Sequence, residues 1–157
     1  MKRFPYSELV RRWKRVKRGK LFKAASASGY PIYGWRYDGG GPAVYLSAGI
    51  HGDEPAGPMA VTRLLGKHSG WFWQFSWVIF PCLNPWGYER DLRRNEKRVD
   101  LNRLWRENRE PEIRAVRPPT SAPNGTGWSL RVVANKFPAL KIEGDLDRRG
   151  IGVFDLC

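Results

Sequence analysis

The stretch AVYLSAGIHGDEPAGPMAVTRLLGKHSGWFWQFSWVIF, residues 43–80, decides the expected fold of this chain. It begins with Ala43–Ile50, an almost continuously apolar run that is typical of a strand buried on both faces. Pro55 suits the first turn of a helix, and apolar residues recur after it at helical spacing. Phe75–Phe80 indicates a second buried strand. A strand, a helix and a strand at this spacing predict a βαβ unit with parallel strands, and hence an α/β fold.

Upstream of this unit, two further elements are expected. Ile32–Tyr37 alternates in polarity and is rich in aromatic residues, which predicts a strand that ends at a glycine turn. Residues 1–20 contain nine Lys or Arg residues and a single acid, and Leu9 and Trp13 recur there at helical spacing. This pattern predicts a short amphipathic helix with its apolar stripe on the body of the protein and its basic face outward.

Downstream, regular patterns become weaker. Residues 84–103 are polar and punctuated by Pro and Gly, which indicates a long functional loop, and residues 107–117 indicate a helix. Beyond it only residues 129–133 and 151–156 carry weak strand signals. The last forty residues therefore differ in character from the first 117.

Composition limits the class of protein. The chain has 157 residues, 41% hydrophobic and 13% aromatic, which suits one compact domain and excludes a disordered chain. The net charge is 28 − 15 = +13, which favours anionic partners or substrates. No run approaches the roughly 18 apolar residues of a membrane helix. Two cysteines cannot form a disulfide framework and no apolar signal segment follows the basic N-terminus, so we expect a cytoplasmic protein without a membrane partner.

Several side chains with metal-binding or anion-binding chemistry follow the predicted strands. His51 and Glu54 stand three residues apart at the carboxyl end of the first strand, where an imidazole nitrogen and a carboxylate can reach one zinc ion. Arg93, Asn102 and Arg103 offer guanidinium and amide donors that suit a carboxylate or a developing oxyanion. The alternatives are a chance spacing of His and Glu, and ordinary surface arginines in a basic loop.

Three segments together resemble a known family. Ser47–Gly57, then Asn84–Gly87, then Arg93–Arg103 with its ending Asp-Leu-Asn-Arg resemble the zinc carboxypeptidase superfamily. The resemblance is to carboxypeptidase A-like and murein-peptide amidase-like members, related to the succinylglutamate desuccinylase/aspartoacylase group. It implies a mixed eight-stranded β-sheet flanked by helices, incomplete at the C-terminus. Residues 1–117 would be the N-terminal part of the catalytic domain, and residues 118–157 an atypical, poorly ordered tail.

The resemblance also implies roles and a reaction. His51 and Glu54 would be the first two zinc ligands, and Arg93 would polarise the scissile carbonyl, with Arg94 as the alternative one residue away. Asn102 and Arg103 would bind the free carboxylate of a small peptide or N-acyl amino acid. The implied reaction is attack of a zinc-activated water on an amide bond.

This chain departs from the family pattern in two places. A third histidine ligand is expected downstream, but the other histidine, His68, lies upstream of the Asp-Leu-Asn-Arg element. Cys157 stands where that histidine is expected, and Glu143 lacks the setting of the family's general base. Alternatives are therefore a non-catalytic remnant of the fold and a basic nucleic-acid-binding protein. We do not expect nucleic-acid binding, because no nucleic-acid motif accompanies the charge and the aromatic residues of the stretch 71–77 are expected in the core.

Overall fold

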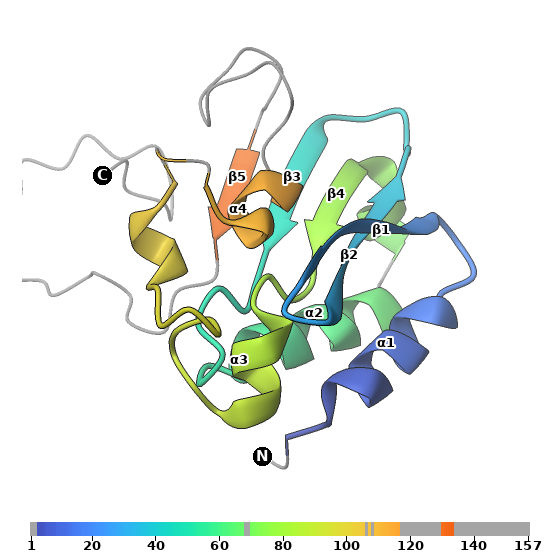
Figure 1. The fold of residues 1–157 in the computed structure, drawn as a ribbon. Coiled ribbons are helices and arrows are strands. Elements are labelled where there is room, and N and C mark those ends of the chain that lie inside the picture. Colours follow the sequence, from blue (N-terminus) through green and yellow to red (C-terminus); the bar gives the residue numbers. More distant parts are fainter. Residues whose placement is uncertain (1–2, 68–69, 106, 108, 117–129, 134–157) are drawn as a thin grey trace, which may run out of the picture.

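The computed structural model describes residues 3–67, 70–105, 107, 109–116 and 130–133. Within these residues one mixed sheet has the strand order β1-β2-β4-β3-β5 (Figure 1). Its strands are β1 (Lys20–Ala27), β2 (Tyr30–Tyr37), β3 (Ala43–Ser47), β4 (Ser76–Phe80) and β5 (Leu130–Val133). The helices are α1 (Tyr6–Lys14), α2 (Ala56–Gly66), α3 (Pro85–Arg90) and α4 (Pro111–Val116), with short 3₁₀ helices η1 (Gly70–Gln74) and η2 (Leu101–Arg103).

The predicted βαβ unit is confirmed. β3 and β4 are parallel, in a register that runs from Ala43 opposite Ser76 to Ser47 opposite Phe80, and α2 connects them. β5 extends the parallel part on the other side of β3. β1, β2 and β4 are joined in antiparallel fashion, so the sheet is mixed as expected.

The sequence analysis did not predict β1. Its pairing with β2 shifts register between Lys23 and Ala25, and most of its side chains are only partly buried because it is an edge strand. The strand therefore lacks a clean alternation of apolar and polar residues. β2 and β3, which flank the glycine turn, are not neighbours, because β4 lies between them.

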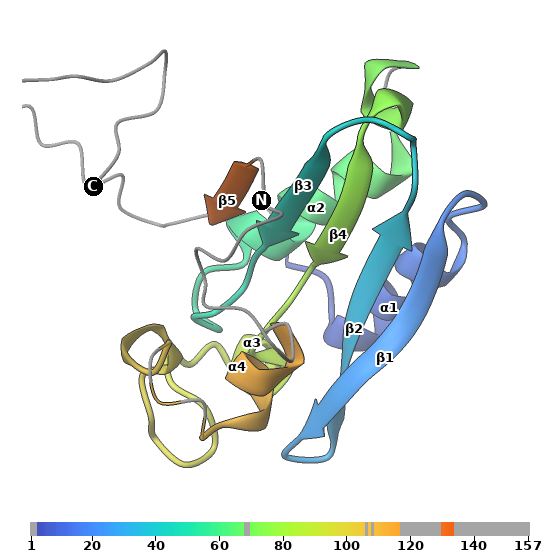
Figure 2. The same ribbon diagram turned by 90° about the horizontal axis from the view of Figure 1, so that it is seen from above.

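Helices cover both faces of the sheet. Figure 2 shows α1 and α2 on one side and α4 on the other. On the first side Leu9 and Trp13 are buried against the sheet, which confirms the amphipathic helix. Trp77 and Phe72 pack there as stacked rings, whereas Trp71 is 51% exposed, so the aromatic stretch is only partly core.

The segment predicted as one long loop, residues 84–103, contains two helical elements. Asn84 caps α3 by accepting a hydrogen bond from the backbone N–H of Gly87 (2.9 Å), and η2 forms the end of the segment. The helix predicted at 107–117 is shorter, and the weak strand signal at 129–133 corresponds to β5. The strand predicted at 151–156 and, apart from β5, the tail 118–157 lie outside the described residues. In the described part of the chain, no helix is long and apolar enough to cross a membrane.

Candidate active site

The candidate site lies beyond the carboxyl ends of β3 and β4. After the strands end, the segments that follow them continue side by side. Two backbone hydrogen bonds join them, from Leu83 N–H to Ala48 O (2.9 Å) and from Asn84 N–H to Gly49 O (2.8 Å). The loop that starts at His51 is therefore fixed against the segment that leads into α3. This is the edge of an open α/β sheet where ligand sites form.

Close backbone packing holds this loop in place. A Cβ added to Gly52 would lie 2.0 Å from the carbonyl carbon of Gly87, so only glycine allows this approach. Arg3 adds a second restraint, because its guanidinium donates to the carbonyl oxygen of Gly52 (2.6 Å) and to that of Tyr88. The same guanidinium lies 4.3 Å above the Tyr88 ring. This part of the basic N-terminal segment thus positions the site rather than facing solvent.

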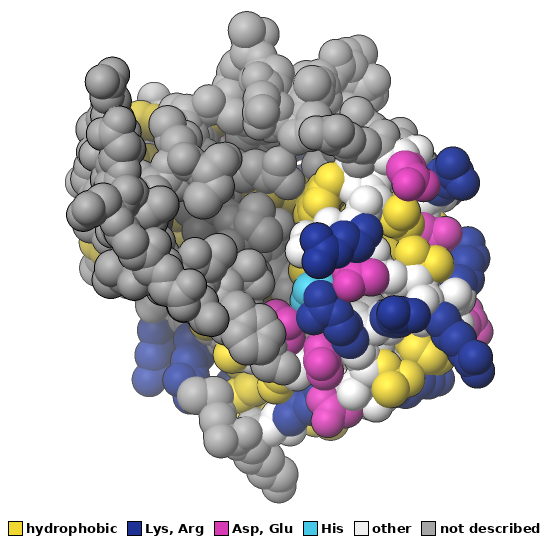
Figure 3. Space-filling view, turned by 90° about the vertical axis from the view of Figure 1, so that its left-hand side faces the viewer, with side chains coloured by type: hydrophobic (Ala, Val, Ile, Leu, Met, Phe, Trp, Pro, Cys, Tyr) yellow, Lys and Arg dark blue, Asp and Glu magenta, His cyan; other side chains and the backbone are white. Residues whose placement is uncertain are grey.

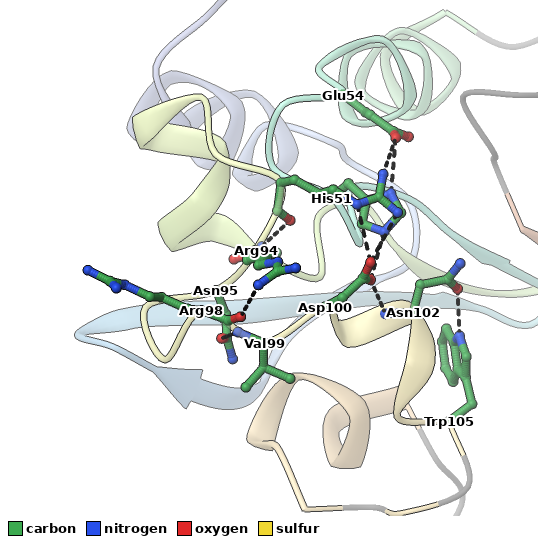
Figure 4. Close-up of polar contacts among 11 residues, drawn as sticks. His51, Glu54, Arg94, Asn95, Arg98, Val99, Asp100, Asn102 and Trp105 are labelled. Atoms are coloured by element: carbon green, nitrogen blue, oxygen red, sulfur yellow. Dashed lines mark hydrogen bonds and ion pairs between the residues drawn. The ribbon is translucent and has the colours of Figure 1, made fainter.

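His51 occupies the centre of the site and is 3% exposed. Its Nδ1 lies 3.0 Å from Oε1 of Glu54, and its Nε2 lies 3.1 Å from Oδ1 of Asp100 (Figure 4). The contact of His51 with Glu54 was expected from the sequence, whereas its contact with Asp100 was not. The imidazole is thus held between two carboxylates.

Asp100 is a site residue that sequence reasoning missed. Burial alone would raise the pKa of Asp100, but hydrogen bonds from His51, Arg93 and the backbone N–H of Asn102 outweigh it and lower the pKa. In the tautomer in which His51 Nε2–H donates to an ionised Asp100, the Nδ1 lone pair faces Glu54. The signal available in the sequence was the aspartate of Asp-Leu-Asn-Arg, to which no role had been given.

The two adjacent arginines differ sharply in position. Arg93 donates from Nε and Nη2 to Asp100 Oδ2 (3.2 and 3.1 Å), and its Nη1 lies 3.8 Å from Oε1 of Glu54. Arg94 points away and donates to the backbone carbonyl oxygen of Arg98 (Figure 4). The structure therefore brings Arg93, and not Arg94, to the His51–Glu54 pair.

Asn102 and Arg103 follow Asp100 on η2. The side-chain oxygen of Asn102 accepts a hydrogen bond from Trp105 Nε1 (2.9 Å), and its backbone N–H donates to Asp100 Oδ1 (3.1 Å). Asn102 is thus tied to the site through Asp100. The side chain of Arg103 is exposed and forms no hydrogen bond or ion pair with the described residues, and therefore none with His51.

The donor set fits part of a zinc site. A lone pair and a carboxylate oxygen 3.0 Å apart repel each other unless a proton or a cation lies between them. Zinc bonds to nitrogen and oxygen of about 2.0–2.2 Å allow one ion to reach both His51 Nδ1 and Glu54, with Asp100 as the carboxylate that orients the histidine. Among the described residues, however, no group of three His, Cys, Asp or Glu side chains is placed to hold a metal. His68, Cys157 and Glu143 lie outside those residues.

The surface around this centre carries both signs of charge. Figure 3 shows a small area of histidine surface surrounded by alternating basic and acidic side chains. The side chain of Arg93 is 40% exposed, whereas those of Glu54 and Asp100 are 12% and 19% exposed. A ligand that approaches from solvent therefore meets the guanidinium first.

Comparison with known proteins places this geometry in a family. Residues 40–119 match the succinylglutamate desuccinylase/aspartoacylase catalytic domain. The chain belongs to this family. The match spans His51, Glu54, Arg93 and the Asp-Leu-Asn-Arg element, and it confirms the resemblance expected from the sequence. A search of curated proteins gave no match.

Solved structures place the chain in the zinc carboxypeptidase fold. A provisionally assigned metallopeptidase from Shewanella amazonensis is 27% identical with a TM-score of 0.53, over 60% of this chain and 37% of its own. A metallo-carboxypeptidase from Burkholderia cenocepacia is 21% identical with a TM-score of 0.60, over 71% of this chain and 35% of its own. Thrombin activatable fibrinolysis inhibitor is 22% identical with a TM-score of 0.55, over 71% of this chain and 41% of its own. The chain thus spans well under half the length of these proteins, and the two less identical ones support the fold alone.

Proposed function

We propose that this chain carries the first part of the active site of a zinc-dependent hydrolase. Its substrate would be a small peptide or an N-acyl amino acid, cleaved at the amide bond next to a free carboxylate. The observation that supports this most strongly is the 3.0 Å approach of His51 Nδ1 to Glu54, with Asp100 behind the imidazole. A buried histidine held between two carboxylates suits a cation far better than it suits an apolar core.

His51 and Glu54 would hold the metal, and Asp100 would keep His51 in the tautomer that binds it. The metal would supply a Lewis acid and a water of lowered pKa. Asp100 achieves its part by accepting the Nε2 proton, which fixes the ring and leaves Nδ1 as the ligand atom. The two acidic neighbours of His51 would thus have different roles, Glu54 as a metal ligand and Asp100 as the residue that orients the ring.

Arg93 would bind the carbonyl oxygen of the scissile amide. Two of its nitrogens are anchored on Asp100, and Nη1 is the nitrogen nearest Glu54. A positive charge at this position stabilises the oxyanion that develops when the carbonyl is attacked. Asn102 and Arg103 would bind the substrate carboxylate, because an amide NH₂ and a guanidinium both donate hydrogen bonds to it.

The alternative is a non-catalytic remnant of this fold. It is favoured by one observation, that the described residues provide two metal ligands rather than three. Two ligands hold zinc weakly, and we therefore expect substoichiometric zinc after dialysis and little turnover from the 157-residue chain alone.

The first test is zinc binding measured by isothermal titration calorimetry. The two histidines of the chain provide a matched pair of variants, His51→Ala and His68→Ala. We expect His51→Ala to abolish the weak zinc binding of the wild type and His68→Ala to leave it unchanged. Equal binding by wild type and His51→Ala would overturn the proposed site, and one tightly held ion would overturn the expectation of weak binding.

The second test is hydrolysis, with zinc in excess, of a panel of N-acyl amino acids and carboxylate-terminated dipeptides. Any turnover should stop with a chelator, be lost in His51→Ala and persist in His68→Ala. Peptides blocked at the terminal carboxylate should be poorer substrates, because they lose the partner of Asn102 and Arg103. Turnover that survives His51→Ala would refute the metal-dependent mechanism, and no turnover from any substrate favours the remnant.

A further inference from the structure

A cavity that does not include His51 lies between α1 and α2. It has a volume of about 550 Å³, within the range of about 300–1,000 Å³ usual for small-molecule sites. It lies along the second half of α2, beyond Thr62, whereas His51 precedes the first residue of that helix. The residues of its lining that matter here are Arg12, Arg15, Lys17, Arg18, Thr62 and Trp73.

The walls of this cavity are strongly basic. Arg12 is already paired with Glu8, at 2.8 Å between Nε and Oε1. Arg15, Lys17 and Arg18 form no ion pair with any residue in the described ranges of the chain. Three cations thus converge on one cavity without an acidic partner among those residues, and a bound anion would relieve their mutual repulsion.

Arg18 is held in position before any ligand arrives. Its backbone carbonyl oxygen accepts a hydrogen bond from Trp35 Nε1 (3.1 Å), and its guanidinium lies 5.0 Å above the Trp73 ring. A guanidinium stacked on an aromatic face keeps its N–H edge directed outward. The cost of ordering a long side chain is thereby reduced, which favours binding.

The aromatic wall favours an anion over a nucleobase. Trp73 is packed against Tyr37, with ring centroids 4.7 Å apart, in addition to its contact with Arg18. Its ring is therefore used to hold protein side chains rather than presented for stacking on a base. The recognition chemistry of the cavity is that of guanidinium and ammonium groups, which suits phosphate.

We propose that this basic cavity binds a ligand that carries at least two phosphate groups. A phosphate monoester carries about −1.5 to −2 charges at pH 7, so two such groups balance three or four cations. The cavity size admits a soluble polyphosphate ester or the headgroup of a phospholipid that carries two phosphate groups. The site is independent of the zinc centre, and its failure would leave the proposed hydrolase function untouched.

The test is calorimetric titration of the full chain with inorganic tripolyphosphate at physiological salt. The double variant Arg15→Gln/Lys17→Gln removes two cavity charges from exposed side chains, and Lys23→Gln/Arg114→Gln removes the same charge from exposed side chains elsewhere. Because the cavity variant loses two charged hydrogen-bond donors, we expect it to bind about tenfold or more weakly and the control to bind like wild type.

A second arm distinguishes the source of the phosphate. Co-sedimentation with vesicles of phosphatidylcholine and cardiolipin, a lipid whose headgroup carries two phosphate groups, again with both variants, would reveal a lipid headgroup as the ligand, whereas tripolyphosphate binding alone indicates a soluble ligand. Equal weakening by both double variants would show that net charge alone attracts anions, and would overturn the proposal. Absence of binding in both arms would overturn it as well.

Discussion

Replacing Gly52 by alanine should destabilise the protein and disturb the proposed metal site together. The added Cβ would lie 2.0 Å from the carbonyl carbon of Gly87, 2.3 Å from the backbone nitrogen of Tyr88 and 2.4 Å from the carbonyl oxygen of Gly87. All three are backbone atoms, so no rotation of a side chain can relieve the clash. Normal carbon contacts lie at about 3.5 Å, and the loop must therefore move away from α3 by roughly 1.5 Å.

The loss in the free energy of unfolding follows from the packing and the hydrogen bonds that such a movement disturbs. Overpacking of a well-packed interior costs typically about 1–3 kcal/mol. The movement also strains two hydrogen bonds, from Gly52 N–H to Arg93 O (3.4 Å) and from Arg3 to Gly52 O (2.6 Å), each worth about 1 kcal/mol. We expect a loss of about 3 kcal/mol in the free energy of unfolding, a large part of the 5–15 kcal/mol of an ordinary domain.

The assay is urea denaturation, with Gly66→Ala as the matched control. A Cβ at Gly66, the last residue of α2, meets no atom within 4 Å. Because alanine favours a helix by about 1 kcal/mol over glycine, this control should be neutral or slightly stabilising. Equal stabilities of the two variants would refute the reasoning, as would a Gly52→Ala protein that keeps wild-type zinc binding despite a displaced loop.

Three further predictions concern polar side chains in other parts of the structure. Asp100→Asn should weaken zinc binding about 10–100-fold in calorimetric titration, because the hydrogen bond that orients His51 is changed, and unaltered binding would count against that role. Trp13→Phe should lower the free energy of unfolding in urea by about 1–3 kcal/mol, because the indole N–H donates to buried Thr62 Oγ1 at 2.8 Å; no loss of stability would show that this bond contributes little. Burial raises the pKa of Glu112, so its ionisation costs stability as the pH rises above the ordinary glutamate range. Glu112→Gln should therefore resist urea better than wild type at pH 7 and lose this advantage near pH 4. An advantage that grows on acidification would contradict the raised pKa of Glu112.

Local patterns in the sequence are enough to predict the part of the fold that carries the site. β3 and β4 are recognised as short apolar runs and α2 by apolar residues at helical spacing, and α2 ends at a glycine, Gly66. His51 and Glu54 lie within one short loop of this unit, so their approach needs no distant contact to be foreseen. α1 can also be predicted locally, because its apolar stripe lies within a single helix of nine residues.

Elements without a local pattern could not be predicted in this way. β1 is an edge strand with a register shift, and it forms a strand because it pairs with β2. α3 is only six residues long, and it is defined by the cap at Asn84 rather than by an apolar period. Such elements depend on their surroundings, and sequence reasoning treated that region as loop.

What the sequence by itself determined is the α/β class, the parallel βαβ unit and the pairing of His51 with Glu54, because all three depend on residues close together in the chain. Which of Arg93 and Arg94 lies beside the His51–Glu54 pair was decided only by the tertiary structure. The two residues are chemically identical and adjacent, and they differ only in that Arg93 reaches Asp100 while Arg94 reaches Arg98. The role of Asp100 likewise depends on a contact across 49 residues of sequence, which no local period encodes.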